Sequence, residues 1–88
     1  MKIKEGYVLR EVAGQAVVIA VGEASKTFHG MINLNETGKQ IWQGVSRGMS
    51  VEEIAGELAR DYEVNPETAL HDTNVMIEKM RAAGVLEE

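Results

Sequence analysis

The N-terminal third of the chain consists of short runs of β-branched residues separated by small or polar residues. Residues 7–21 contain two such runs, which are separated at Ala13, Gly14 and Gln15. A glycine there can take the positive φ angle that a tight turn needs, so the pattern predicts a β-hairpin. Residues 17–21 have no polar interruption. We therefore expect the second strand to be the central one, with a neighbour on each edge.

The sequence after the hairpin predicts a loop and one more strand. Residues 22–27 are small and polar, which is typical of a loop, and residues 30–34 suit a third strand. A sheet of three consecutive antiparallel strands leaves one edge of the third strand without a partner. We expect this edge to expose backbone N–H and C=O groups to which another chain can bind.

From residue 36 onward the apolar residues recur at helical spacing, and this pattern predicts three helices. The first should cover residues 36–45 and the third should end near residue 83. Each helix has its own start signal, namely an N-cap, a capping box and an Asn-Pro pair: Asn35, then Ser50 with Glu53, then Asn65 with Pro66. The expected fold class is α+β, with an N-terminal three-stranded antiparallel sheet followed by three helices in a winged-helix-like arrangement.

The third predicted helix has two neighbouring stripes of residues. The broader stripe is mainly apolar and should pack in the core: Ala69, Thr73, Met76, Ile77, Met80 and Ala83. The second stripe is mixed, and its apolar member lies where the wall of a groove is expected: Thr68, Asp72, Val75 and Lys79. Met31 and Met76 are the unbranched side chains that suit an adaptable groove, whereas Met80 is expected in the core. For Met76 both positions remain open.

Composition and charge narrow the class of protein. Eighty-eight residues suffice for one core but not for two, so we expect a single domain over residues 1–88. Fourteen acidic residues outnumber nine Lys and Arg, and the net charge of −5 disfavours nucleic-acid binding. The chain has no cysteine, no pattern of a signal peptide and no apolar run long enough to span a membrane. A soluble, cytoplasmic protein is therefore expected.

The residues that could carry out catalysis do not form a recognisable site. His29 and His71 lie far apart in the sequence, and neither has carboxylates at a known metal-ligand spacing. The serines have no histidine nearby, and no phosphate-binding glycine pattern precedes a helix. We expect no enzyme activity, no metal and no cofactor. Asp72 has two interpretations of equal weight: it contacts a bound peptide, or it is a solvated acid or one paired with Lys79 or Arg81.

The order and spacing of particular residues resemble the PqqD-like family, named for pyrroloquinoline quinone synthesis protein D. The resemblance covers nearly the whole chain and depends on these residues: Leu34, Asn35, Gly38, Ile41, Gly48, Met49, Ser50, Ile54, Leu58, Tyr62, Asp72, Ile77, Met80, Gly84, Val85 and Leu86. The run over residues 28–42 is more similar to stand-alone members than to the founding protein. The founding protein's role in quinone cofactor synthesis is not carried over, because the residues that match are largely those that make the fold.

The resemblance implies a non-catalytic peptide-binding adaptor. Members bind the leader of a ribosomally synthesised precursor peptide and present it to a modifying enzyme, often a radical S-adenosylmethionine enzyme. In the family the leader adds as a strand to the third strand of the sheet, and the third helix forms the other wall of the groove. The corresponding residues of this chain are Gly30, Met31, Ile32, Asn33, Leu34, Thr68, Asp72, Val75, Met76 and Lys79.

Two other functions fit the same predicted elements. Three helices after a sheet can also form a winged-helix DNA-binding regulator, although the acidic residues of the third helix disfavour that reading. The unpaired strand edge can also pair with a second copy of the chain, which would give a weak homodimer in place of a monomer. Such a dimer would compete with a peptide for the same edge.

Overall fold

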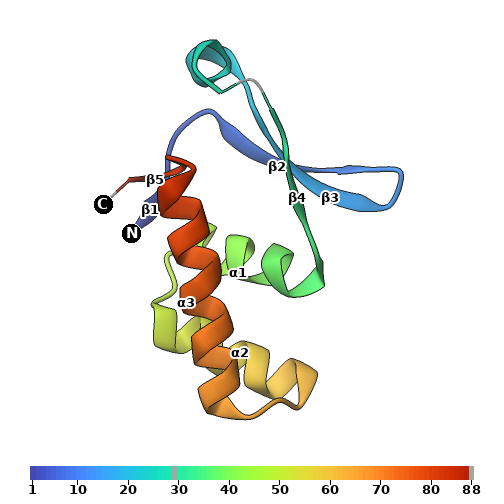
Figure 1. Cartoon of the computed structure of the whole chain (residues 1–88), viewed down its shortest axis with the longest axis vertical. Coiled ribbons are helices and arrows are strands. Elements are labelled where there is room, and N and C mark those ends of the chain that lie inside the picture. Colours follow the sequence, from blue (N-terminus) through green and yellow to red (C-terminus); the bar gives the residue numbers. More distant parts are fainter. Residues whose placement is uncertain (29, 88) are drawn as a thin grey trace.

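The computed structural model describes residues 1–28 and 30–87, and the statements below refer to these residues. Strands β2 (Tyr7–Val12), β3 (Gln15–Ala20) and β4 (Ile32–Leu34) form an antiparallel sheet in the order β2-β3-β4. Helices α1 (Glu36–Ser46), α2 (Val51–Tyr62) and α3 (Pro66–Ala82) follow (Figure 1). The predicted fold class, hairpin and central second strand are confirmed.

The three predicted helix starts are also confirmed. Asn35 caps α1 by accepting a hydrogen bond from the Gly38 amide, and Ser50 and Glu53 form both hydrogen bonds of the capping box of α2. Asn65 caps α3 with Pro66 in its first turn. These side chains satisfy amides that have no partner within the helix, which fixes where each helix begins.

Two predictions about the segment before α1 are wrong. Residues 22–27 are not a plain loop, because the short 3-10 helix η1 (Gly22–Lys26) lies there. The third strand begins at Ile32, so Gly30 and Met31 precede it. The ring of Phe28 packs edge-on against Tyr7 of β2, with the ring centroids 5.5 Å apart. This contact attaches the segment to the start of β2, and β4 pairs with β3 only after the chain has returned from that contact.

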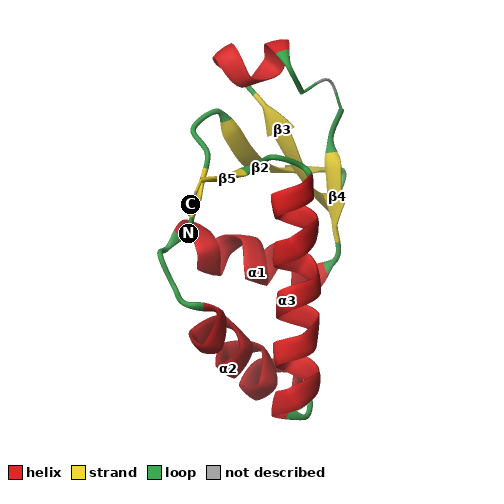
Figure 2. Ribbon diagram, turned by 60° about the vertical axis from the view of Figure 1, so that its left-hand side comes forward, coloured by secondary structure: helices red, strands yellow, loops and turns green. Residues whose placement is uncertain are grey.

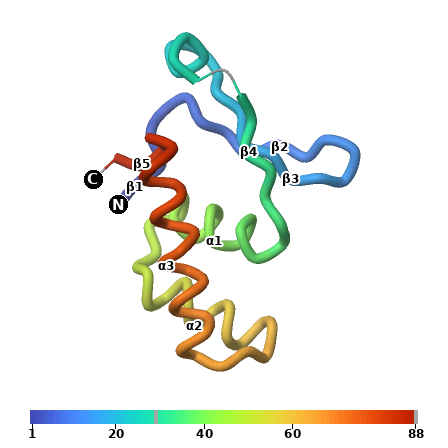
Figure 3. Tube along the Cα trace, viewed as in Figure 1, coloured from blue at the N-terminus to red at the C-terminus, as the bar shows by residue number. Residues whose placement is uncertain are grey.

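A second, two-stranded sheet joins the two ends of the described chain. Strand β1 (Lys2–Ile3) pairs antiparallel with β5 (Leu86–Glu87), and Figures 1 and 3 show the termini side by side. Val85, which leads into β5, is fully buried. The pairing itself was not predicted, because a two-residue strand has no periodicity to detect.

The core lies between the sheet and the helices. Its members come from β3, β4, the three helices and the C-terminal segment, and they include the most buried side chains of the chain: Val18, Ile41, Trp42, Val45, Ile54, Leu58, Ile77, Met80 and Val85. Trp42 is 3% exposed, as expected for an anchor between α1 and the sheet. Ala83 was expected in the core but is exposed, because it is the C-cap that follows the end of α3 at Ala82, and the buried stripe of the helix ends at Met80.

An ion pair joins the tip of the hairpin to α1. Lys39 Nζ lies 2.5 Å from Glu11 Oε1. The hydrogen bond from Lys39 and its charge lower the pKa of Glu11, and the same contact raises the pKa of Lys39. The side chain of Glu11 is 57% exposed and that of Lys39 is 27% exposed, so solvent screens the pair and it contributes little to stability. It holds the hairpin tip against the first turns of α1.

Helices α1 and α2 are in tight contact at Gly44. A Cβ atom at this buried glycine would lie 2.7 Å from Ile54 Cγ1. We expect Gly44→Ala to lower the free energy of unfolding by about 1–2 kcal/mol, because overpacking outweighs the better helix propensity of alanine. Urea denaturation measures this change. The matched control is Gly56→Ala in α2, where nothing lies within 4 Å, and it should raise stability slightly. Equal effects at the two positions would contradict the close contact.

Candidate functional site

The outer edge of β4 is unpaired among the described residues, since β4 contacts only β3 in the sheet order. The register with β3 pairs Leu34 with Ala16, Asn33 with Val17 and Ile32 with Val18. In an antiparallel sheet, successive residues direct their backbone N–H and C=O groups alternately toward one neighbour and the other. The register therefore determines which residue of β4 offers its backbone outward.

The hairpin fixes this alternation. Ala13 and Gly14 both have positive φ angles, as in a two-residue type I′ turn, so the Val12–Gln15 pair that closes the turn is a hydrogen-bonded pair. Hydrogen-bonded and non-hydrogen-bonded pairs alternate along the ladder, so Arg10–Val17, two residues further along each strand, is also a hydrogen-bonded pair. The same phase is seen at the other end, where the Val21 amide donates to the Gly6 carbonyl at 2.7 Å.

Asn33 is consequently the outward-facing residue of β4. The backbone of Val17 is directed toward β2, so its partner Asn33 has no ladder bond to β3 and directs its N–H and C=O away from the sheet. The flanking residues Ile32 and Leu34 are bonded to β3. Asn33 is exposed, whereas Leu34 is 5% exposed and packs in the core.

Strand β4 runs beside the C-terminal half of α3 (Figure 2). The residues that line a hollow of about 360 Å³ come from both of these elements. We call it the first hollow. Its walls are β4 and α3, and its floor is α1, with these lining residues: Ile32, Asn33, Leu34, Asn35, Gly38, Trp42, Met76, Lys79, Met80 and Ala83. Lys79 is the only charged residue among them. The first hollow therefore fits an apolar side chain carried by a strand at the edge of β4.

A second hollow of about 290 Å³ continues from the first toward the start of α3. It is more polar, with these lining residues: Asn35, Thr37, Gly38, Ile41, Asp72, Val75, Met76 and Lys79. Four of them also line the first hollow, namely Asn35, Gly38, Met76 and Lys79. The two hollows thus form one continuous groove along α3, which we call the groove below.

The structure brings together most of the residues that the sequence proposed as a site. Five of the ten line the first hollow: Ile32, Asn33, Leu34, Met76 and Lys79. Asp72 and Val75 line the second. Gly30, Met31 and Thr68 line neither. Gly30 and Met31 lie before β4 begins, and Thr68 lies one turn of α3 before Asp72, beyond the end of the groove.

Sequence reasoning missed the floor of the groove. Asn35, Thr37, Gly38 and Trp42 are contributed by the start of α1. The sequence identified Asn35 only as a helix cap, and it gave Thr37, Gly38 and Trp42 no part in the site. The one residue that could have indicated this floor from the sequence was Gly38. It is buried, and a Cβ atom at this position would lie within 4 Å of the side chains of Leu34 and Asn35. A glycine in the first turn of a helix indicates close packing there.

The two charged groups of the groove do not pair with each other. Among the described residues, no ion pair joins Asp72 to Lys79 or to Arg81, and Arg81 pairs instead with Glu78. Of the interpretations of Asp72, the ion pair with Lys79 or Arg81 is not formed, while the solvated acid and the contact with a bound peptide both stay open. Both Asp72 and Lys79 are exposed to solvent, so each charge remains available to a ligand in the groove.

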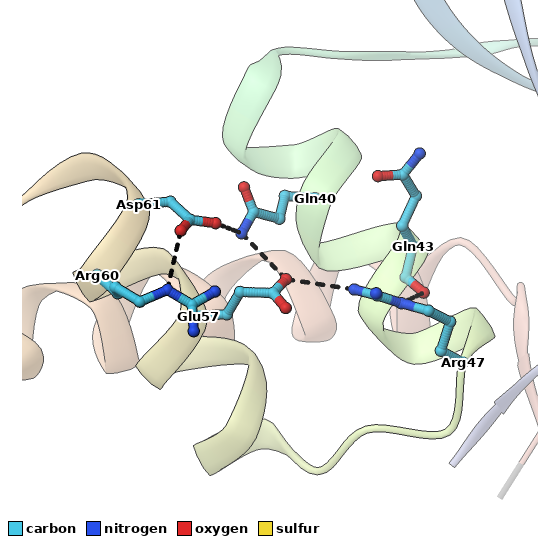
Figure 4. Close-up of polar contacts among 6 residues, drawn as sticks. All are labelled: Gln40, Gln43, Arg47, Glu57, Arg60 and Asp61. Atoms are coloured by element: carbon cyan, nitrogen blue, oxygen red, sulfur yellow. Dashed lines mark hydrogen bonds and ion pairs between the residues drawn. The ribbon is translucent and has the colours of Figure 1, made fainter.

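A second cluster of polar side chains lies on α1 and α2 (Figure 4). Gln40 donates to Glu57 at 3.1 Å and to Asp61 at 2.9 Å, and Arg47 donates to Glu57 at 3.2 Å. The hydrogen bond from Gln40, with a further one from Arg60, lowers the pKa of Asp61. Every acid in this network already has partners, so the network joins α1 to α2 and leaves no group directed at a ligand.

The described residues offer little for other kinds of site. No group of three or more His, Cys, Asp or Glu residues within residues 1–28 and 30–87 could hold a metal ion. None of the helices over the same residues is both long and apolar enough to cross a membrane. His29, the other histidine besides His71, lies outside the described residues.

The candidate site of this α+β domain is therefore an open sheet edge with a groove beside it. The sequence matches the family described as coenzyme PQQ synthesis protein D (PqqD) over residues 15–86. The chain therefore belongs to the PqqD family, which confirms the resemblance seen in the sequence. No curated protein sequence matches the chain significantly.

Two solved structures share the fold. One is TbiB1 in complex with the TbiA(beta) leader peptide, at a TM-score of 0.80 and 22% identity, covering 99% of this chain and 95% of the other. The second is lasso peptide synthetase B1 complexed with the leader peptide, at a TM-score of 0.81 and 18% identity, covering 99% and 96%. At these identities the likeness establishes the architecture, including the three-stranded sheet followed by three helices.

Proposed function

We propose that this chain is a non-catalytic adaptor that binds the leader of a ribosomally synthesised precursor peptide and presents it to a modifying enzyme. The observation that carries the proposal is the outward-facing backbone of Asn33 beside the groove. We propose that the whole chain acts as one recognition domain. Its proposed place of action is the cytoplasm, which agrees with the absence of cysteine.

The family and the fold support a peptide as the ligand. The two solved structures with this architecture are of proteins complexed with leader peptides. The modifying enzyme is proposed from the resemblance to the family, in which it is often a radical S-adenosylmethionine enzyme. We therefore propose a precursor peptide as one partner and an enzyme of that class as the other.

Binding would use strand addition at β4. A peptide strand alongside Asn33 would exchange backbone hydrogen bonds with it, and alternate side chains would enter the groove. Backbone bonds supply affinity for any extended peptide, while the hollows select among side chains. Ile32, Leu34, Val75, Met76 and Lys79 are the residues proposed to contact these side chains. Gly30, Met31 and Thr68 are proposed to contact only the parts of a longer peptide that extend past the groove.

A DNA-binding regulator fits this surface less well. The exposed side of α3 carries Glu67, Asp72 and Glu78, and Arg81 is paired with Glu78. A winged-helix regulator inserts one helix into the major groove of DNA. The acidic side chains of α3 and the protein's net charge of −5 would repel the phosphate backbone there. Pairing of two β4 edges in a homodimer stays a prediction, which sedimentation over a concentration series tests.

Fluorescence titration tests the proposal. Trp42 is the only tryptophan of the chain and lines the first hollow, so its emission should change when a peptide enters the groove. The ligands to test are synthetic peptides that correspond to the N-terminal parts of short reading frames next to the gene. Saturable binding that survives Gln40→Ala, a change on the α1–α2 surface, supports the proposal. No saturation at millimolar peptide from any such reading frame would contradict it.

A further inference from the structure

The groove contains one acid and one base at separate positions, and this arrangement says which peptide it selects. Asp72 lines only the second hollow, whereas Lys79 lines both hollows. Neither is in an ion pair among the described residues, and both are exposed. The inference below depends on the proposed function and concerns the same groove.

The two charges lie on one face of α3. Seven residues separate them, which is two helical turns and about 10 Å along the axis. An extended strand covers the same distance in about three residues. A peptide lying along the groove therefore passes the two charges about three residues apart.

The course of β4 relates this spacing to a chain direction. Ile32, at the start of β4, lines the first hollow together with Ala83, at the C-terminal end of α3. Asn35 and Thr37, after the end of β4, line the second hollow with Asp72, nearer the start of α3. The chain from β4 into α1 therefore runs opposite to α3. A strand that pairs antiparallel with β4 runs in the same direction as α3 and reaches Asp72 before Lys79.

We propose that the leader segment recognised here carries a basic residue followed about three residues later by an acidic residue. The basic side chain binds Asp72 in the second hollow, and the acidic side chain binds Lys79. An apolar side chain near the acidic one fills the first hollow between Met76, Met80 and Trp42. Antiparallel pairing is slightly the more stable of the two strand arrangements, which sets this order. In the parallel arrangement the order of the charges along the peptide would be reversed.

Exposed ion pairs are weak, so the order of charges acts as a selector and not as the main source of affinity. Each matched contact should change affinity roughly two- to five-fold. A peptide with the charges in the proposed order meets two attractions, and the same peptide with the charges exchanged meets two repulsions. The two peptides should therefore differ in affinity by about ten-fold or more at low salt.

The test is a selection from a displayed library of random twelve-residue peptides on the immobilised chain. The wild-type chain should enrich peptides with a Lys or Arg before an Asp or Glu at the stated spacing. The double variant Asp72→Lys/Lys79→Asp keeps the net charge and should enrich the reverse order. The variant Glu67→Lys changes a charge of α3 outside the groove and should keep the wild-type order. Circular dichroism checks that each variant is folded.

The outcomes separate this inference from the proposed function. Enriched peptides that bind in the groove without any charge order, or with an acid before a base on the wild-type chain, overturn the inference and leave the adaptor function intact. If no peptide that perturbs Trp42 fluorescence is enriched, the adaptor function itself is overturned. Synthetic peptides with the two charges exchanged then measure the ratio of dissociation constants directly.

Discussion

Replacing Asn33 by proline should weaken peptide binding by about 30- to 150-fold, which corresponds to about 2–3 kcal/mol. Proline removes the outward N–H that an added strand needs as a donor, and its ring blocks close approach of that strand. The backbone of Asn33 makes no ladder bond to β3, so the sheet itself loses none. Titration of the variant with a peptide bound by the wild-type chain measures the effect.

Asn33→Ala is the matched control for this experiment. It removes the exposed side chain and keeps the backbone donor, so binding should change by no more than a few-fold. Thermal unfolding of both variants should remain close to that of the wild-type chain, because proline is tolerated on the open edge of a sheet. Equal losses of affinity in the two variants would show that the asparagine side chain, and not strand addition, recognises the peptide.

Truncation of Trp42 should have the largest effect on stability. Trp42→Ala should lower the free energy of unfolding by about 3–5 kcal/mol, through lost apolar burial and the cavity that remains. Stability for a chain of this size is about 4–13 kcal/mol, so this change removes a large fraction of it. Trp42 is 3% exposed and joins α1, the sheet and the floor of the first hollow. Urea denaturation followed by circular dichroism measures the loss.

Tyr62→Ala is a suitable comparison, since Tyr62 ends α2 and is 40% exposed. Its truncation should cost less, about 1–2 kcal/mol, because Tyr62 is only partly buried and no enclosed cavity remains. If Trp42→Ala cost no more than this, the core beneath the groove would not depend on the indole. The groove would then have to be held in shape by the remaining core residues.

Most of the fold could be predicted because its elements have local signals. The hairpin turn, the caps at Asn35 and Asn65 and the capping box at Ser50 each depend on a few neighbouring residues. The pairing of β1 with β5 depends on two-residue strands at opposite ends of the chain, which no periodicity reveals. Helix η1 was missed because its small polar residues also suit a loop.

The candidate site could be predicted only in part, for a related reason. The third strand and the stripe of α3 were visible in the sequence, so Ile32, Asn33 and Met76 were found. The floor contributed by α1 was missed because an apolar residue such as Trp42 follows the same helical spacing at the base of a groove as in the core. The start of β4 depends on where the preceding segment packs against Tyr7, which is a tertiary contact that no local pattern encodes.

The most direct test of strand addition is amide hydrogen exchange of the isotope-labelled chain, with and without a saturating groove-binding peptide, followed by NMR. The Asn33 amide should exchange rapidly in the chain alone and become strongly protected on binding, while the α1–α2 surface around Gln40 is unchanged. An Asn33 amide that still exchanges rapidly at saturation, with protection confined to other surfaces, would rule out strand addition at β4.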